Sequence, residues 1–162
     1  MIAPVLSSPK ALDRTLGYAL PVSAPVRLPI RVGRRSRPLL RVLFGVRPEN
    51  AWIELGGEPG DDLSVRFGWY GFRTPLANLA SWRIEGPFRW ITAIGVRRSL
   101  RHGDVTFGGS HHGGVRIDFR APVPWGPFRV PAIYVPADDL EALGAELTRL
   151  GVPGPDARPS GR

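Results

Sequence analysis

Short runs of residues that alternate between apolar and polar most constrain what this chain folds into. In the stretch over 63–86, Leu63, Val65, Phe67 and Trp69 follow one another at every second position. Successive side chains of a strand point to opposite faces, so this spacing predicts a β-strand with one buried face. A second alternating run closes the stretch after a glycine-rich turn and a polar link. We therefore expect the central hairpin of a sheet, and replacing Phe67 or Trp69 with alanine should unfold it.

The composition favours many short strands. The 162 residues include 20 glycines and 18 prolines, which are typical of turns rather than long helices. A hydrophobic share of 43% suffices for the packed core of one domain. There is no cysteine, so disulfides, thiolate metal sites and cysteine nucleophiles are excluded.

No targeting segment stands out in the sequence. Pro4 and Pro9 interrupt the first residues, so no continuous apolar region forms there. The longest apolar run, Leu39 to Val46, contains Arg41 and is too short to span a membrane. We expect a cytoplasmic protein, either soluble or peripheral at the inner membrane face.

Positive charge is concentrated in residues 1–48. This part holds nine basic residues and one acid, Asp13, and nine minus one gives +8. The whole chain also has a formal net charge of +8, so residues 49–162 balance, with 13 basic and 13 acidic residues. Lys10 is the single lysine, and the planar guanidinium of arginine binds phosphate and carboxylate through two hydrogen bonds. The amino-terminal part is therefore where we expect an anionic partner to bind.

The chain divides into an arm, a domain and a tail. Residues 1–26 are rich in proline and lack a clear period, so we expect a flexible arm. The domain covers 27–150, and the proline- and glycine-rich residues 151–162 are expected to be disordered. The domain opens with an alternating run over 27–32, in which Pro29 predicts an edge strand because it lacks a backbone donor.

A short basic helix is predicted after this first strand. Ser36 can cap it, its first turn tolerates Pro38, and Gly45 can end it. Its apolar side docks on the domain's own core or, in the alternative, on a membrane. That side consists of Leu39, Leu40, Leu43 and Phe44, with Arg37 and Arg41 on the other side.

The clearest helix covers 138–150. Asp138 and Glu141 have the spacing of a capping box, and Gly151 can end the helix. Gly144 inside it costs about 1 kcal/mol relative to alanine, which close approach to a sheet could offset. One apolar stripe is formed by Leu140, Leu143, Leu147 and Leu150.

No catalytic signature is present. Ser110, His111 and His112 lie in a glycine loop without a nearby acid to complete a triad, and we interpret the loop as mobile. Asp61 and Asp62 lie in a turn, where paired carboxylates are typically solvated. We therefore expect no enzyme, no catalytic residue, no metal ligand and no cofactor.

About seven short strands followed by one amphipathic helix predict a mainly β fold, a small curved sheet or barrel capped by that helix. Three segments carry a resemblance to a known family: LSVRFGWYGFRTPLANLASWRIEG (63–86), GVRIDF (114–119) and IYVPADDLEALGAEL (133–147). They resemble bacterial pleckstrin-homology-like (PH-like) domains, especially small proteins of high-GC, actinobacterial-type bacteria. The resemblance covers about 27–150 and implies a bent antiparallel, partly open barrel that serves as a lipid- or protein-binding module.

The basic segment after the first strand is the candidate site. Phosphoinositide-binding PH domains carry a basic motif at a comparable place, occupied here by arginines alone. We expect a non-enzymatic interaction module that docks on a protein partner or on anionic lipid headgroups. Nucleic acid is the weaker partner because no aromatic residues are interleaved, and the alternative function is a β-barrel that binds a small apolar ligand. The candidates are Arg31, Arg34, Arg35, Arg37 and Arg41, with a secondary basic cluster of Arg97, Arg98 and Arg101.

Overall fold

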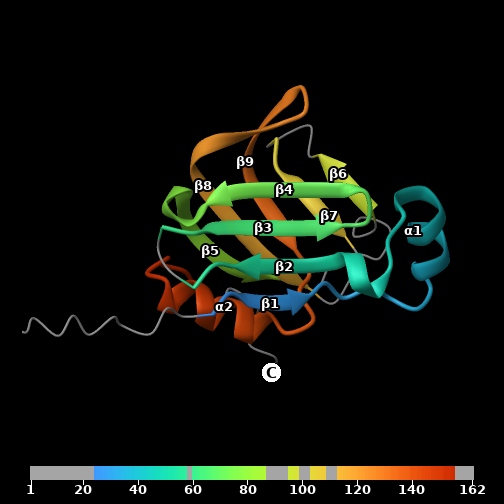
Figure 1. The fold of residues 1–162 in the computed structure, drawn as a ribbon, viewed down its shortest axis with the longest axis horizontal. Helices are drawn as coiled ribbons and strands as arrows, with labels where there is room; N and C mark the ends of the chain where they lie inside the picture. The colour runs from blue at the N-terminus through green and yellow to red at the C-terminus, as the bar shows by residue number, and fades with distance from the viewer. Residues whose placement is uncertain (1–23, 58–59, 87–94, 99–102, 109–112, 156–162) are drawn as a thin grey trace, which may run out of the picture.

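The computed structural model describes residues 24–57, 60–86, 95–98, 103–108 and 113–155. They form a mainly β fold of two sheets, with a carboxyl-terminal helix and a short helix after the first strand, as expected. Figure 1 shows one sheet in front of the other, with the two sets of strands crossing obliquely. The sheets stay separate within the described residues, which agrees with the expected open arrangement.

The first sheet is an antiparallel meander of four strands in chain order. Its first strand lies at the edge, as Pro29 predicted. This strand ends at Pro29 and is therefore shorter than the alternating run over 27–32. The last two strands are joined by the two-residue turn of Gly68 and Trp69, so that Phe67 pairs with Tyr70. The strands are β1 (Val26–Pro29), β2 (Ala51–Leu55), β3 (Asp62–Phe67) and β4 (Tyr70–Pro75).

The second sheet has the strand order β5-β8-β9-β7-β6. The β6–β7 hairpin lies between β5 and β8 in the chain, yet it extends the sheet beyond β9. β7 runs parallel to β9, so this sheet is not antiparallel throughout. The described residues hold nine strands where about seven were expected. The strands are β5 (Leu79–Glu85), β6 (Gly95–Arg98), β7 (Val105–Gly108), β8 (Gly114–Trp125) and β9 (Phe128–Val135).

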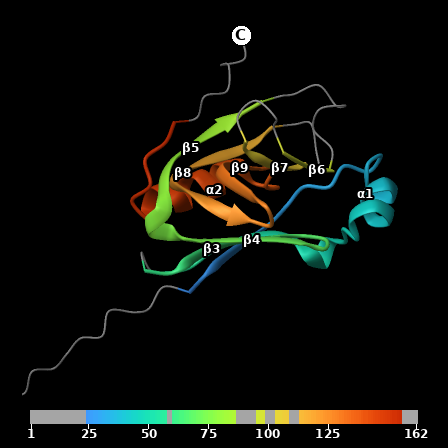
Figure 2. The same cartoon turned by 90° about the horizontal axis from the view of Figure 1, so that it is seen from above.

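The stretch over 63–86 is a corner between the sheets, and the expectation of one central hairpin is wrong. Tyr70–Pro75 is itself a strand, and the short helix η2 (Leu76–Asn78) turns the chain into the second sheet. Figure 2 shows this crossing from β4 to β5. The alternating pattern missed β4 because its buried positions are Phe72 and Thr74, of which only Phe72 is apolar.

Apolar side chains from both sheets fill the space between them. Phe67 and Phe107 are fully buried, with ring centroids 6.3 Å apart. Phe72 stacks on Phe119 with centroids 5.4 Å apart. These rings belong to one core cluster, to which Leu143 and Leu147 contribute from α2 (Leu140–Arg149).

The N-cap of α2 lies one residue later than predicted, and the helix begins at Leu140. The carboxylate of Asp139 accepts a hydrogen bond from the backbone N–H of Ala142 at 2.8 Å, so Asp139 caps the helix and Asp138 does not. Asp138 pairs with Arg31 instead, at 2.7 Å. This ion pair joins the end of the first strand to the start of the last helix.

α2 packs against β5 and β8 and ends with a turn back toward the sheet. Gly144 faces the ring of Trp82, where a Cβ would lie 2.8 Å from the indole, as expected of a close approach to a sheet. Residues 151–155 of the expected tail lie along β5 and are hydrogen-bonded to it. The rest of that tail, 156–162, and residues 1–23 of the expected arm lie outside the described residues.

Candidate functional site

α1 (Arg37–Phe44) lies where the sequence predicted the short basic helix. Pro38 is in its first turn, and Gly45 ends it with a φ of 64°, a left-handed conformation that favours glycine. Ser36 stands at the N-cap, although its hydroxyl donates to the carbonyl of Gly33 and accepts no cap hydrogen bond from a helix N–H. Local signals therefore placed this helix correctly.

One fully buried side chain attaches α1 to the core. Leu40 is inaccessible to solvent, and Phe44 is half-buried against the core. Leu39 and Leu43, expected on the same side of the helix as Leu40, are 51% and 54% exposed, and Val42 is 75% exposed. Of the two arrangements expected, docking of the whole apolar side on the core is not observed, because α1 lies beside the sheets rather than across them (Figure 1), so only part of the helix reaches the core.

The turn between β3 and β4 is fastened to the end of α1. The backbone N–H of Trp69 donates to the carbonyl of Phe44 at 3.0 Å. The indole lies so close over Gly45 that a Cβ there would be 2.3 Å from its nitrogen. Trp69 is 66% exposed, which corrects the expectation that it belongs to the core. The alternation stops at Phe67 because Gly68 and Trp69 form the turn.

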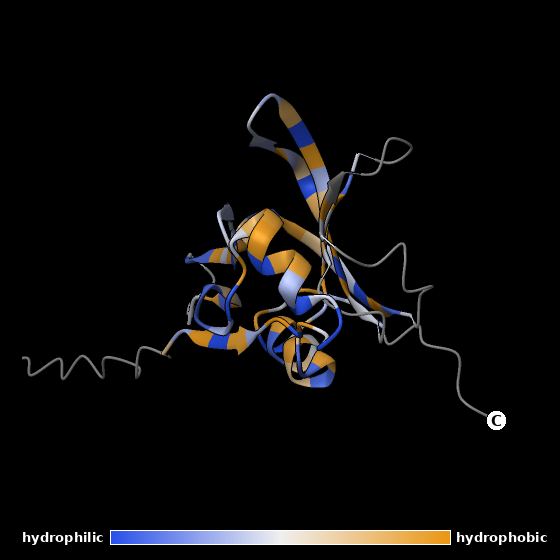
Figure 3. Cartoon of the chain, turned by 90° about the vertical axis from the view of Figure 1, so that its right-hand side faces the viewer, coloured by the Kyte–Doolittle hydropathy of each residue, from blue (hydrophilic) through white to orange (hydrophobic). Residues whose placement is uncertain are grey.

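Exposed apolar side chains gather on the outward side of α1. Leu39 precedes Val42 by three residues and Leu43 by four, so the three side chains share one side of the helix. The exposed indole of Trp69 lies at the carboxyl end of the same helix. Figure 3 looks onto the side of the molecule where α1 lies, and the helix carries both hydrophobic and hydrophilic residues. Contiguous exposed apolar patches are typical of surfaces that bind a partner.

Exposed arginines accompany this apolar patch. Arg31 is engaged by Asp138, whose carboxylate and backbone carbonyl both accept hydrogen bonds from the guanidinium. The other arginines from position 34 to 47 are exposed and have no ion-pair partner among the described residues. What we term the α1 surface consists of Leu39, Val42, Leu43 and Trp69 together with Arg34, Arg35, Arg37, Arg41 and Arg47.

Three arginines of the α1 surface line a groove between α1 and the short helix η1 (Pro48–Asn50). The groove has a volume of about 870 Å³, and Arg37, Arg41 and Arg47 contribute to its wall. Glu49 is the one carboxylate in that wall. Guanidinium groups in this arrangement can donate several hydrogen bonds to one phosphate or carboxylate group.

Most arginines elsewhere in the described part of the chain pair with carboxylates. Arg116 contacts both Asp104, at 2.7 Å, and Asp118, at 3.0 Å. Arg83 donates to Glu85, and this hydrogen bond raises the pKa of its guanidinium. The pairs Arg27–Glu54, Arg73–Asp62 and Arg149–Glu146 add three more. Positive charge without a local partner is therefore concentrated at the α1 surface.

Of the secondary basic cluster, the structure describes only β6, which contacts α1, with Gly95 against the ring of Phe44. Arg97 and Arg98 lie in β6, and Arg101 lies outside the described residues. The serine–histidine segment at 110–112 also lies outside them. Asp62, expected as a solvated residue of a turn, is instead the first residue of β3 and pairs with Arg73 at 2.6 Å.

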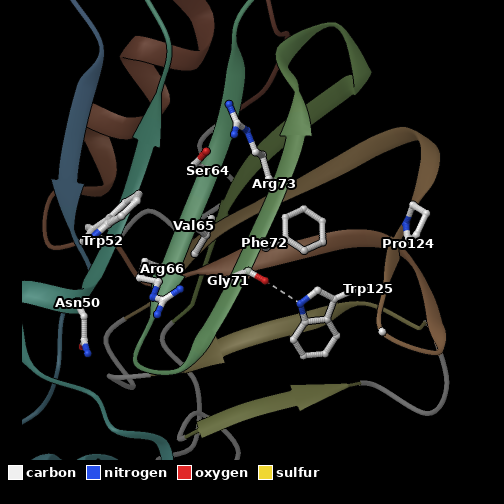
Figure 4. Close-up of a pocket in the computed structure, with 11 residues that line it drawn as sticks. Asn50, Trp52, Ser64, Val65, Arg66, Gly71, Phe72, Arg73, Pro124 and Trp125 are labelled. Atoms are coloured by element: carbon white, nitrogen blue, oxygen red, sulfur yellow. Dashed lines mark hydrogen bonds between the residues drawn. The ribbon is translucent and has the colours of Figure 1, made fainter.

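A second groove, of about 720 Å³, lies on the outer face of the first sheet (Figure 4). Trp52, Arg66 and Trp125 are among its lining residues. The indole N–H of Trp125 donates to the carbonyl of Gly71 at 2.9 Å, which fastens the tip of the β8–β9 hairpin to β4. The lining contains no carboxylate or histidine that could act as an acid or a base.

Comparison with protein-family models, with curated proteins and with solved structures finds no match to this chain. The PH-like resemblance therefore stays a prediction from the sequence. No helix in the described ranges is long and apolar enough to cross a membrane. Within the same ranges, no group of three or more histidine, aspartate or glutamate side chains is placed to hold a metal ion.

Proposed function

We propose that this chain is a non-enzymatic interaction module that docks on an anionic membrane, at its inner face, through the α1 surface. The observation that carries the proposal is that Leu39, Val42 and Leu43 are exposed on α1, while the arginines on this helix and next to its ends lack ion-pair partners in the described part of the chain. An amphipathic helix of this kind lies at the boundary between headgroups and acyl chains, with its apolar side toward the lipid.

The arginines would supply long-range attraction and headgroup contacts. Each basic side chain near an anionic leaflet is worth about 1 kcal/mol, so the α1 surface could gain several kcal/mol before the loss of orientational freedom. This attraction falls off within about 8 Å at physiological ionic strength, so it requires side chains that are exposed at the surface. Arg34, Arg35, Arg37, Arg41 and Arg47 meet that condition.

The apolar side chains favour a lipid surface over a nucleic acid. A nucleic-acid backbone would bind the arginines through its phosphates and leave Leu39, Val42 and Leu43 in water. A bilayer would also remove these side chains from water, at about 25 cal/mol per Å² of apolar surface buried. The indole of Trp69 suits the same boundary, where tryptophan is enriched in membrane proteins.

The fold class adds support from a second direction. The PH-like resemblance implies a bent sheet capped by a carboxyl-terminal helix and a role in lipid or protein binding. The observed fold is mainly β with a carboxyl-terminal helix, which is compatible with that expectation. A small apolar ligand between the sheets is less well supported, because side chains such as Phe67 and Phe107 occupy that space. The α1 surface is therefore the part of the chain that best accounts for a binding function.

Co-sedimentation with lipid vesicles tests the proposal. We expect binding to vesicles that contain phosphatidylglycerol, no binding to pure phosphatidylcholine vesicles, and weaker binding as salt is raised. Arg37→Glu/Arg41→Glu should lower the affinity by more than about tenfold, because two attractive charges become repulsive. Leu39→Ser/Leu43→Ser should weaken binding while preserving its salt dependence.

A matched control separates the α1 surface from net charge alone. Arg66→Glu/Arg129→Glu changes the charge equally, at two exposed arginines that have no ion pair in the described residues and lie outside the α1 surface. We expect this variant to retain most of its binding. An equal loss of vesicle binding in both charge variants would mean that net charge alone drives binding. Full binding by Leu39→Ser/Leu43→Ser would overturn docking through the apolar side.

A further inference from the structure

The chain beyond α2 returns along the open edge of β5. β5 is the terminal strand of its sheet, so one of its edges has no neighbouring strand in the described part of the chain. Gly151, with a φ of 81°, turns the chain after the helix, and the next residues run beside this edge. The backbone N–H of Trp82 donates to the carbonyl of Pro153 at 3.0 Å, and that of Ile84 donates to Pro155 at 3.3 Å. Two donors of an edge strand are thereby satisfied.

The side chain of Trp82 also contacts this segment and forms part of its binding surface. Its indole N–H donates to the carbonyl of Val152 at 3.1 Å. Gly154 crosses the ring so closely that a Cβ would lie 2.1 Å from the carbonyl oxygen of Trp82 and 2.5 Å from the indole. Only glycine therefore fits at position 154 without a shift of the backbone. The surface formed by the edge of β5 and the ring of Trp82 thus selects for glycine at this position.

Residues 152–155 make fewer contacts with β5 than a regular neighbouring strand would. Pro153 and Pro155 have no backbone N–H, so they can accept hydrogen bonds from β5 but cannot donate any. Both prolines and Gly154 are exposed, and Val152 alone is buried in the core cluster. Three hydrogen bonds join the segment to β5, and a fourth joins the N–H of Val152 to the carbonyl of Leu147 in α2. A segment held by four hydrogen bonds and one buried side chain can detach without unfolding the sheets.

We propose that the edge of β5 is a binding site for an extended peptide of the pattern valine–proline–glycine–proline, and that residues 152–155 occupy it in the free chain. Such a peptide supplies acceptors at alternate positions for the N–H groups of Trp82 and Ile84, a third acceptor for the indole, and a glycine over the ring. This is strand addition with proline carbonyls. The site is separate from the α1 surface, so it does not depend on membrane docking.

The attached segment competes with any such partner. A tethered occupant has an effective concentration in the millimolar range, so a peptide in solution binds the intact chain weakly. Displacement of the segment removes this competition and exposes the site. The carboxyl-terminal segment therefore acts as an intramolecular inhibitor of the peptide site.

Calorimetric titration with a synthetic peptide of residues 151–157 tests the proposal on the full-length chain. Gly154→Val prevents the attached segment from seating, because its side chain would meet the backbone of Trp82. We expect this variant to bind the peptide at least about tenfold more tightly than the natural chain does. Gly60→Val is the matched control, since a Cβ at Gly60 meets nothing within 4 Å, and it should behave as the natural chain.

A second peptide, with valine in place of its glycine, should not bind any of the three proteins. The natural peptide should shift the amide resonances of Trp82 and Ile84 in the Gly154→Val chain. A folded Gly154→Val chain that binds neither peptide, or binds both alike, would overturn the proposal. If Gly154→Val does not fold, the titration uses Pro153→Gly/Pro155→Gly, which loosens the attached segment by raising its entropy when detached. Absence of tighter binding there overturns the proposal equally.

Discussion

The backbone N–H of Trp69 donates to the carbonyl of Phe44, and this bond joins the β3–β4 turn to the last turn of α1. Gly68 lies against the same carbonyl, where a Cβ would be 1.9 Å from the oxygen. The rings of Phe44 and Tyr70, with centroids 6.0 Å apart, extend the contact. A turn of the first sheet therefore sets the position of the helix that carries the α1 surface.

Gly68→Ala should destabilise the domain and displace α1. The residue has a φ of 61°, which strains any side chain, and its new Cβ would meet the carbonyl of Phe44. We expect the free energy of unfolding to fall by roughly 1–3 kcal/mol, measured by urea denaturation. Gly60→Ala adds the same methyl group in open space and should stay within about 0.5 kcal/mol of the natural chain. Equal stability of the two variants would contradict this account of the turn.

Leu40→Ala and Leu39→Ala make a matched pair on one helix. Leu40 is fully buried, and its truncation should cost about 2–5 kcal/mol in the free energy of unfolding. Leu39 is half exposed, and its truncation should change stability by less than about 1 kcal/mol while weakening vesicle binding. Thermal unfolding and co-sedimentation on both variants check the pair. The reverse order of stabilities would show that α1 docks through its other side.

Phe67→Ala and Trp69→Ala should differ in their effect on the free energy of unfolding. Phe67 is inaccessible to solvent between the sheets, so its truncation should cost about 3–5 kcal/mol and can unfold the domain. Trp69 is largely exposed, so Trp69→Ala should stay folded, by circular dichroism, and lose affinity for anionic vesicles. An unfolded Trp69→Ala chain would restore the core role that the alternating pattern indicates.

Local sequence signals predicted elements better than they predicted burial. Pro38 and Gly45 act on the backbone around them, so the bounds of α1 could be predicted from the sequence. Which apolar residues of α1 are buried depends on how the helix meets the sheets, and that contact is not local. The sequence therefore left open whether Leu39 is exposed. It did not indicate the exposure of Trp69, although the glycine before Trp69 is a turn signal.

Pairings between distant strands were also beyond the sequence pattern. The parallel pair of β7 and β9 joins Val105 to Ile133, and no turn signal links the two segments. The sequence did not indicate that residues 152–155 lie along β5, because a segment rich in proline and glycine is typical of disorder. The signal that could have indicated it is the alternation of Pro153 and Pro155 around a glycine, which places carbonyl acceptors on one side of an extended chain.

Gly144→Ala tests whether the contact of α2 with Trp82 outweighs helix propensity. In a free helix this change is worth about 1 kcal/mol in favour of alanine. Here the new Cβ would lie 2.8 Å from the indole. The ring has little room to move, because Gly154 lies against its other end and its N–H is bonded to Val152. We expect a net loss of about 1–3 kcal/mol by urea denaturation.

A double-mutant cycle isolates the cause of that loss. Trp82→Phe removes the outer ring atoms that the alanine at position 144 would meet, at its own cost in stability. In this background, Gly144→Ala should no longer destabilise the chain and should approach the gain of about 1 kcal/mol that helix propensity predicts. The same loss in both backgrounds would mean that Gly144 is needed for a reason other than its approach to Trp82.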